Sequence, residues 1–375
     1  VNTALTGTII YNTNIDLGLG VFVWDGDNWQ PVGEPYIPHP TVPAPTCPNP
    51  VPAVTFMAYN LGADVDKLMA LYPDLSPAKQ QMKYLANHDF NKLDATVYGG
   101  LFQWGRKDFE HAVKIPEYTR YDGAADNAVV GQTSDVIPPD RKFYYSSSNW
   151  YKGTSPAPDA LWGNGVAIGT AIDGGVYSSN SSYYQKPVRT QYDPCPAGWR
   201  VPTQDEWERL ANYGCGTPQT AGGDITPTIS GHSTINSGLT WIPVVCNKIS
   251  GQCIPSKSWT TDVTSTGYAV YKASVWTAAK ATGNVYAGLT DSNVATIFTG
   301  KSLHDDDAPE PLLFLPTAGH RNAGPGIGGV GMTGSYGYYW SSTIDVVAVF
   351  YSIVDPANTS AVWRSHGFSV RCVKE

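Results

Sequence analysis

The sequence predicts an α+β protein in which loops outweigh regular secondary structure. Its 375 residues include 38 glycines and 29 prolines, well above the usual combined share of about 12%. Roughly the last 60 residues alternate short strand-forming runs with glycines, and two helix starts are clearly marked upstream. Hydrophobic residues make up 42% and aromatic residues 12% of the chain, enough apolar area to exclude global disorder.

Residues 1–34 are expected to form a small N-terminal β region. Residues 8–11 and 21–24 are rich in β-branched and aromatic residues, and Asp25-Gly26-Asp27 is typical of a hairpin turn. Residues 35–53 are rich in proline, which fixes φ and removes backbone donors. This segment is predicted to be an extended linker, so that residues 54–375 form the main domain.

Two helices of the main domain have clear N-terminal signals. Ser76 followed by Pro77 is a capping residue before proline at the first helical position, with Met82 and Leu85 on one face. Residues 203–206 read Thr-Gln-Asp-Glu, a capping box, and apolar residues follow at helical spacing until Gly214. These signals predict short helices rather than long ones.

Residues 215–308 are predicted to be a long insertion in the main domain. The segment is rich in Thr, Ser and Gly and has only short β-prone runs, such as residues 268–276. Within it, Cys246 and Cys253 are separated by six residues, which is typical of a loop staple in an oxidising compartment. The alternative is that the six cysteines are buried thiols, although none has Cys-x-x-Cys spacing.

The charge of the chain restricts its partners. The net charge is −8 and the pI is about 5.3, whereas nucleic acids and anionic membranes require clustered Lys and Arg. No apolar run approaches the ~18 residues of a membrane span. Because the sequence starts at Val1 without an export signal, an exported protein would have lost that signal or carry it outside this sequence.

Five short motifs carry a family likeness. They are residues 58–64 (Ala-Tyr-Asn-Leu-Gly-Ala-Asp), 98–106 (Tyr-Gly-Gly-Leu-Phe-Gln-Trp-Gly-Arg), 193–203 (Asp-Pro-Cys-Pro-Ala-Gly-Trp-Arg-Val-Pro-Thr), 339–342 (Tyr-Trp-Ser-Ser) and 367–372 (Gly-Phe-Ser-Val-Arg-Cys). As an ordered set they resemble the signatures of the Fibrobacter succinogenes major paralogous domain. The resemblance covers about residues 54–375. It implies a C-type-lectin-like fold of the formylglycine-generating-enzyme subtype on exported proteins of Bacteroidales-type bacteria.

A narrower resemblance concerns residues 339–372. They are similar to the variable region of proteins diversified by retroelements, in which Trp-Ser-Ser and Gly-Phe-Ser-Val-Arg-Cys stay fixed while the intervening residues vary. Some of these relatives are pilus-tip adhesins and others are phage tail receptor-binding proteins. The resemblance implies a ligand-binding surface made of Ile344, Asp345, Val346, Val347, Val349, Phe350, Trp363, Ser365 and His366. The alternative is that residues 346–354 form a buried strand, since β-branched runs are usually core.

The family motifs also contain Cys195 and Cys372, which we predict to form a structural disulfide. As nucleophiles they are a weaker hypothesis, because the paired catalytic cysteines of the enzyme subfamily are not matched. No catalytic residue is therefore predicted. Asp108, Glu110 and His111 lie close in sequence, but we interpret them as a structural hydrogen-bonding segment.

No cofactor or metal is predicted. His304, Asp305, Asp306 and Asp307, together with Glu310, offer oxygen ligands for calcium. The sugar-binding triplets of calcium-dependent lectins are absent, however, so a solvated acidic loop is favoured. The histidines have no metal-ligand spacing.

These observations predict a non-catalytic ligand-binding protein at the cell surface, whose ligand is a protein or a glycan, with pilus subunits as further candidate partners. A phage tail receptor-binding protein, a structural pilus subunit that adds residues 1–34 to a neighbour's sheet, and a formylglycine-generating-type enzyme are the alternatives. The pairing of Cys47 and Cys215 stays open.

Overall fold

The computed structural model describes residues 9–12, 20–24, 29–31, 41–42, 54–88, 95–108, 110–113, 128–146, 149–162, 171–172, 175–176, 189–203, 206–207, 239–247, 251–255, 266–272, 274–275, 302–321, 330–331, 333–334, 336–342, 346–351, 358–361 and 363–375. Before residue 54 and between residues 346 and 361 this description is of the backbone alone.

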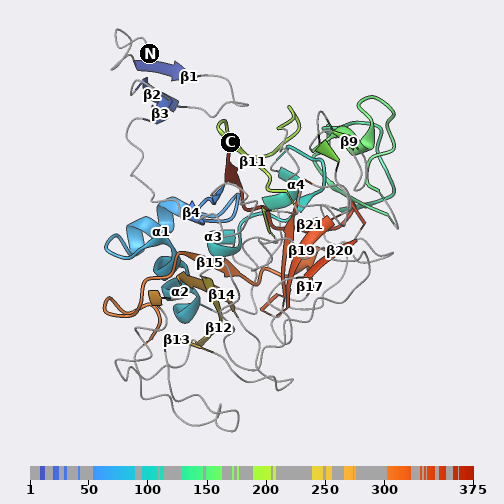
Figure 1. The fold of residues 1–375 in the computed structure, drawn as a ribbon. Coiled ribbons are helices and arrows are strands. Elements are labelled where there is room, and N and C mark those ends of the chain that lie inside the picture. The colour runs from blue at the N-terminus through green and yellow to red at the C-terminus, as the bar shows by residue number, and fades with distance from the viewer. Residues whose placement is uncertain are drawn as a thin grey trace.

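The predicted α+β class is confirmed, with strands predominating (Figure 1). The helices are α1 (Val65–Leu71), α2 (Pro77–Asn87), α3 (Ala95–Tyr98), α4 (Glu110–Val113) and a 3-10 turn, η3 (Pro158–Ala160). The strands up to residue 200 are β1 (Ile9–Asn12), β2 (Gly20–Trp24), β3 (Trp29–Pro31), β4 (Thr41–Val42), β5 (Val54–Thr55), β6 (Phe102–Gln103), β7 (Ala128–Val130), β8 (Phe143–Tyr145), β9 (Ala171–Ile172), β10 (Gly175–Val176) and β11 (Trp199–Arg200). Those that follow are β12 (Leu239–Asn247), β13 (Gln252–Pro255), β14 (Gly267–Lys272), β15 (Leu313–Pro316), β16 (His320–Arg321), β17 (Val330–Gly331), β18 (Tyr336–Trp340), β19 (Val346–Tyr351), β20 (Asn358–Ala361), β21 (Gly367–Phe368) and β22 (Val373–Lys374).

The N-terminal region contains the strands that the sequence predicts. β1, β2 and β3 form an antiparallel sheet in that order, and the β2–β3 hairpin brings Trp24 opposite Trp29. The proline-rich segment differs from a fully extended linker, because β4 pairs with β5 at the start of the main domain. Thr41 and Val42 of β4 are not proline and keep the N–H groups that such pairing needs.

Both helix starts lie where the sequence places them. The Ser76 side chain accepts a hydrogen bond from the backbone N–H of Lys79, and Met82 and Leu85 of α2 are buried. In the capping box, the Thr203 N–H donates to the Glu206 carboxylate at 2.8 Å, and the Glu206 N–H donates back to the Thr203 hydroxyl at 3.4 Å. The predicted continuation of this helix to Gly214 lies outside the described residues.

The predicted insertion at residues 215–308 contains strands of a four-stranded sheet. The strand order of this sheet is β13-β12-β14-β15, so three of its four strands come from that segment. Helix α2 packs against β12, β13 and β15 (Figure 1), and Ile242 and Tyr271 share a buried cluster with Met82. The apolar runs of this segment are short and stand among Ser, Thr and Gly. Pairing with long-range antiparallel partners stabilises them as strands.

The family motifs meet in the interior around the guanidinium of Arg371, which is fully buried. It donates to the side-chain oxygen of Asn60 at 2.9 Å and to the carbonyls of Met57 and Phe314 at 3.1 and 2.8 Å. Burial lowers the pKa of Arg371 to about 10. The side-chain amide of Asn60 in turn donates to the Tyr98 carbonyl and to the Tyr339 hydroxyl, so this arginine links four of the five motifs.

Gly99 allows the motifs at residues 58–64 and 98–106 to approach each other closely. Gly99 has φ +69°, and a Cβ there would lie 2.5 Å from the Leu61 carbonyl oxygen, so both the backbone conformation and the space require glycine.

Two disulfides staple the fold. The predicted bond between Cys195 and Cys372 is present and joins positions 177 residues apart. The predicted Cys246–Cys253 bond is also present and links opposed positions of β12 and β13. Cys47 and Cys215 lie outside the described residues. The two bonds fit an oxidising compartment. None of the described helices has the length and apolar character needed to cross a membrane.

Candidate functional site

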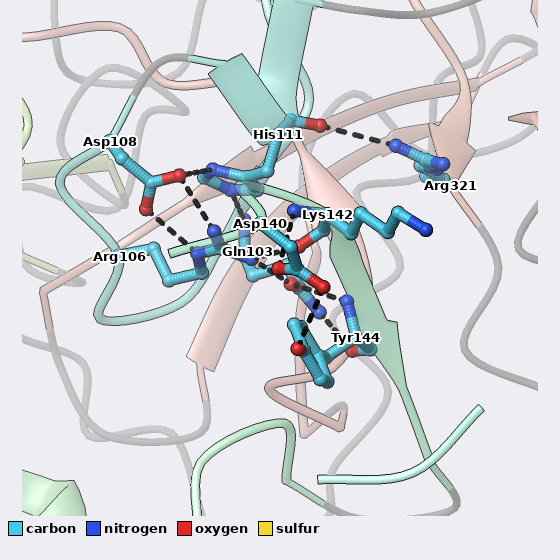
Figure 2. Close-up of polar contacts among 8 residues, drawn as sticks. All are labelled: Gln103, Arg106, Asp108, His111, Asp140, Lys142, Tyr144 and Arg321. Atoms are coloured by element: carbon cyan, nitrogen blue, oxygen red, sulfur yellow. Dashed lines mark hydrogen bonds and ion pairs between the residues drawn. The ribbon is translucent and has the colours of Figure 1, made fainter. Parts of the chain in front are cut away.

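A buried polar cluster lies beside β6 and α4 and is drawn in Figure 2. The Arg106 guanidinium binds both carboxylate oxygens of Asp108, at 2.9 and 2.6 Å. Nδ1 of His111 is 3.2 Å from the same carboxylate, and the backbone N–H of Gln103 donates to Nε2 of His111 at 3.1 Å. Asp108 and His111 thus form an acid–imidazole pair of the kind that hydrolases use.

The hydrogen bonds of this pair favour a structural role. Since the Gln103 N–H donates to Nε2, that nitrogen is the acceptor and the proton of the neutral ring sits on Nδ1, facing Asp108. Burial, followed by the charge of Arg106, lowers the pKa of His111 to about 4. Burial alone would raise the pKa of Asp108, but the hydrogen bonds and charges of His111 and Arg106 outweigh it and lower the pKa. Neither ring nitrogen is left to take a proton from a substrate, which agrees with the structural role expected for residues 108–111.

The cluster holds the C-terminal turn at residues 363–366. The side-chain amide of Gln103 donates to the Ser365 carbonyl at 3.0 Å, and the Trp104 N–H donates to the Arg364 carbonyl at 3.2 Å. The Arg364 guanidinium lies 4.7 Å from the centroid of the Trp104 ring, as a cation–π pair. The turn itself is closed by the His366 N–H, which donates to the Trp363 carbonyl. Interior contacts therefore fix the position of the turn that carries the exposed Trp363.

A continuous row of aromatic rings runs from this turn along β21 and β18. We call it the aromatic row, and it consists of Trp363, His366, Phe368, Tyr338 and Tyr336. Successive ring centroids are 5.7, 5.5, 5.0 and 5.9 Å apart, and successive planes differ by 15°, 14°, 18° and 27°. Phe368 is buried, His366 and both tyrosines are partly exposed, and Trp363 is 46% exposed. The row is thus buried at Phe368 and reaches the surface at Trp363.

The row rests on the buried Trp340. The Trp340 ring centroid is 4.6 Å from that of Phe368, and its indole N–H donates to the Phe102 carbonyl. The backbone of Trp340 donates to Ser369, and that of Ser369 donates to Tyr338. β18 and the chain that follows β21 are therefore joined beneath the row.

The imidazoles at the row are held neutral at pH 7. Burial lowers the pKa of His366, and burial followed by the charge of His366 lowers that of His320 to about 4. The His320 ring meets the Tyr338 ring edge-on at 4.9 Å. Because a carbonyl oxygen can only accept, the 3.1 Å contact between Nδ1 of His366 and the Trp363 carbonyl places the proton on Nδ1. Nε2 of His366 is then an acceptor.

The residues predicted to bind ligand fall into four groups. Trp363 is exposed and His366 is partly exposed, and both belong to the aromatic row. Ser365 is fully buried and its hydroxyl donates to the Ser146 carbonyl at 2.6 Å, so it supports the turn from inside instead of facing a ligand. Ile344 and Asp345 lie outside the described residues, and the remaining four, Val346, Val347, Val349 and Phe350, belong to β19.

The backbone register places β19 beside the aromatic row. Val349 is the Cα partner of Tyr338, and Val347 that of Trp340. Tyr336, Tyr338 and His320 were not among the predicted site residues. The spacing of Tyr336 and Tyr338 by two, ahead of Trp340, was a signal for one face of a strand, but the stacking of that face on Phe368 is not visible in the sequence.

The acidic loop at residues 302–310 encloses a side chain of the protein. The Lys79 ammonium lies 2.8, 3.3 and 2.9 Å from the carbonyl oxygens of Asp305, Asp306 and Ala308. The Glu310 carboxylate is 3.4 Å away. Among the described residues no group of three or more His, Cys, Asp or Glu could hold a metal. The lysine is a buried cation in the place that the sequence offered to calcium.

The fold and the site define a class of protein, namely an α+β, disulfide-bonded domain whose C-terminal turn presents an exposed aromatic side chain. The chain belongs to the Fibrobacter succinogenes major domain family, whose model matches residues 94–374. No curated protein matches the chain, and no solved structure does.

Proposed function

We propose that this protein is a non-catalytic ligand-binding protein of the cell surface, an adhesin or receptor-binding protein that binds through the surface around Trp363. The observation that carries the proposal is the large exposed Trp363 at one end of a ring stack whose middle ring, Phe368, is buried. Exposed tryptophans on a rigid frame are frequent binding hot spots. The frame here is rigid because Gln103, Trp104 and Ser365 bond the turn to the interior.

Binding is favoured over catalysis by the state of the reactive groups. The acid–imidazole pair Asp108–His111 is buried with both ring nitrogens engaged. Four cysteines are in disulfides, which removes them as nucleophiles. A formylglycine-generating activity therefore has no support among the described residues.

The finer parts of the proposal rest on the motifs. A C-type-lectin-like arrangement and diversification by a retroelement would explain why residues 343–366 stand between two fixed motifs. An exported location agrees with the disulfides. A pilus-tip adhesin is the form we favour, and a phage tail receptor-binding protein would use the same surface.

The test is a binding screen with a matched control. The full chain, Trp363→Ala and Ile137→Ala are applied to arrays of oligosaccharides and of purified surface proteins. Ile137 is 44% exposed, close to the 46% of Trp363, and is not part of the aromatic row. We expect Trp363→Ala to weaken binding by about tenfold or more and Ile137→Ala to leave it unchanged. Equal binding by all three proteins would refute the assignment of the surface.

A further inference from the structure

The geometry of the aromatic row points to a more specific ligand. We infer that it binds a neutral glycan without calcium, by stacking the C–H face of a pyranose ring on Trp363. This inference rests on the proposed function, since it names the ligand class of the same surface.

The first argument is the open end of the stack. Each inner ring of the row has near-parallel neighbours on two sides, whereas Trp363 stacks on one ring, His366, at 5.7 Å and 15°. The part of the chain that the structure describes places no second ring against Trp363. With 46% of the side chain exposed, the indole can accept one more flat apolar face at the end of the row.

The second argument is charge. Both imidazoles at the row are neutral at pH 7, and Arg364, the cation within the turn at residues 363–366, is buried over Trp104. The chain as a whole carries −8. An anionic ligand would meet no exposed cation at this turn and would be repelled by the net charge, so an uncharged ligand fits best.

The third argument is the pairing of apolar faces with polar edges. Nε2 of His366 is an acceptor in the ring that stacks on Trp363. A pyranose ring offers C–H groups on one face and hydroxyls at its rim, and so matches both features at once. An aliphatic anchor of a protein partner would match only the rings.

The fourth argument concerns calcium. In the acidic loop the Lys79 ammonium already takes three carbonyl oxygens and a carboxylate. The candidate calcium loop is thus occupied by Lys79. In this proposal stacking and hydrogen bonds hold the glycan at Trp363, and a chelator should not release it.

The experiment uses the full chain and defined probes. Methyl α- and β-glycosides of galactose, glucose, mannose and N-acetylglucosamine are titrated by calorimetry with and without EDTA, beside a sialylated oligosaccharide and a displayed 12-residue peptide library. We expect at least one neutral glycoside to bind equally with and without EDTA. Trp363→Ala should weaken it by about tenfold, as loss of one stacked ring does, whereas Trp363→Phe and Ile137→Ala should stay within about threefold. Unfolding midpoints confirm that each variant is folded.

The outcomes separate this inference from the proposed function. If only peptides bind and Trp363→Ala abolishes their binding, the glycan is wrong and the binding surface stands. If a glycoside binds but EDTA or the acidic sugar displaces it, or Trp363→Ala leaves it unchanged, the stacking mode is wrong. If no probe binds, both the ligand class and the proposed binding surface lose their support.

Discussion

Two regions only a few residues apart in the C-terminal segment have opposite characters. Phe368, Arg371 and Cys372 are 2% exposed or less, whereas Trp363 is 46% exposed. The first group, with Trp340 beneath it, forms what we call the frame. The second is the free end of the aromatic row. Stability and recognition thus depend on different side chains of one short segment, and substitutions should separate the two properties.

The frame is tightly held because its polar groups are paired. Arg371 donates to oxygen atoms of Asn60, Met57 and Phe314, and the Trp340 and Trp207 indoles donate to the carbonyls of Phe102 and Trp340. Leaving such buried groups without partners would cost about 1–3 kcal/mol each. Trp363, by contrast, is 46% exposed, and an exposed side chain can change while the fold persists.

The largest expected effect comes from removing the frame disulfide. The double variant Cys195→Ala/Cys372→Ala opens a loop of 177 residues and should lower the free energy of unfolding by about 5 kcal/mol, because the unfolded chain regains loop entropy. Urea unfolding measures it. The matched control Cys246→Ala/Cys253→Ala opens a loop of only 7 residues and should cost about 2 kcal/mol. Equal losses of stability would contradict the conclusion that the disulfide of the frame stabilises the protein more than the disulfide of the short loop does.

A pair of substitutions within the aromatic row sharpens the comparison. Phe368→Ala removes a buried ring between His366 and Tyr338 and should lower the free energy of unfolding by about 3–5 kcal/mol. Trp363→Ala removes the exposed end of the same row and should cost about 1 kcal/mol or less. Chemical denaturation of both variants provides the test. A loss of several kcal/mol in Trp363→Ala would mean that the turn belongs to the frame.

The smallest effect is a dependence on pH. Burial lowers the pKa values of His111 and His320 to about 4 from 6.5, so in this window the unfolded chain binds protons that the native protein does not. Stability from these groups is complete above pH 6.5 and is lost as the pH falls toward 4. Asp193, whose pKa burial raises to about 6, acts in the opposite sense, because its ionisation penalises the native state as the pH rises from 4 to 6. The two histidines should outweigh the one carboxyl.

The variant His320→Phe measures how much of this pH dependence of stability comes from the His320 imidazole. The substitution keeps a ring against Tyr338 and removes the titrating group. Between pH 7 and pH 5 the wild-type protein should lose on the order of 1 kcal/mol more stability than the variant. Parallel curves for the two proteins would assign the acid sensitivity to His111 and other groups.

Local signals in the sequence were reliable. The capping serine before Pro77, the capping box at residues 203–206 and the hairpin pairing of Trp24 with Trp29 each depend on neighbours within a few residues, and each is present in the structure. The disulfide between Cys195 and Cys372 came instead from the family resemblance, since spacing cannot pair cysteines so far apart.

Long-range features were missed or misjudged. Residues 239–272, within the predicted insertion, supply the central strands of a four-stranded sheet, because pairing with β15 and cover by α2 compensate for their weak local pattern. Ser365 was expected at the surface, but its hydroxyl bonds inward to a residue 219 positions away.

By itself the sequence determined the α+β class, the helix starts, the cysteine staples and the exposure of Trp363, because these follow from composition, local hydrogen bonding and recognisable motifs. Only the tertiary structure decided that Tyr336, Tyr338, Phe368, His366 and Trp363 stack in one row and that Lys79 fills the acidic loop. Both arrangements join side chains that are distant along the chain, and packing in three dimensions alone brings such groups into contact.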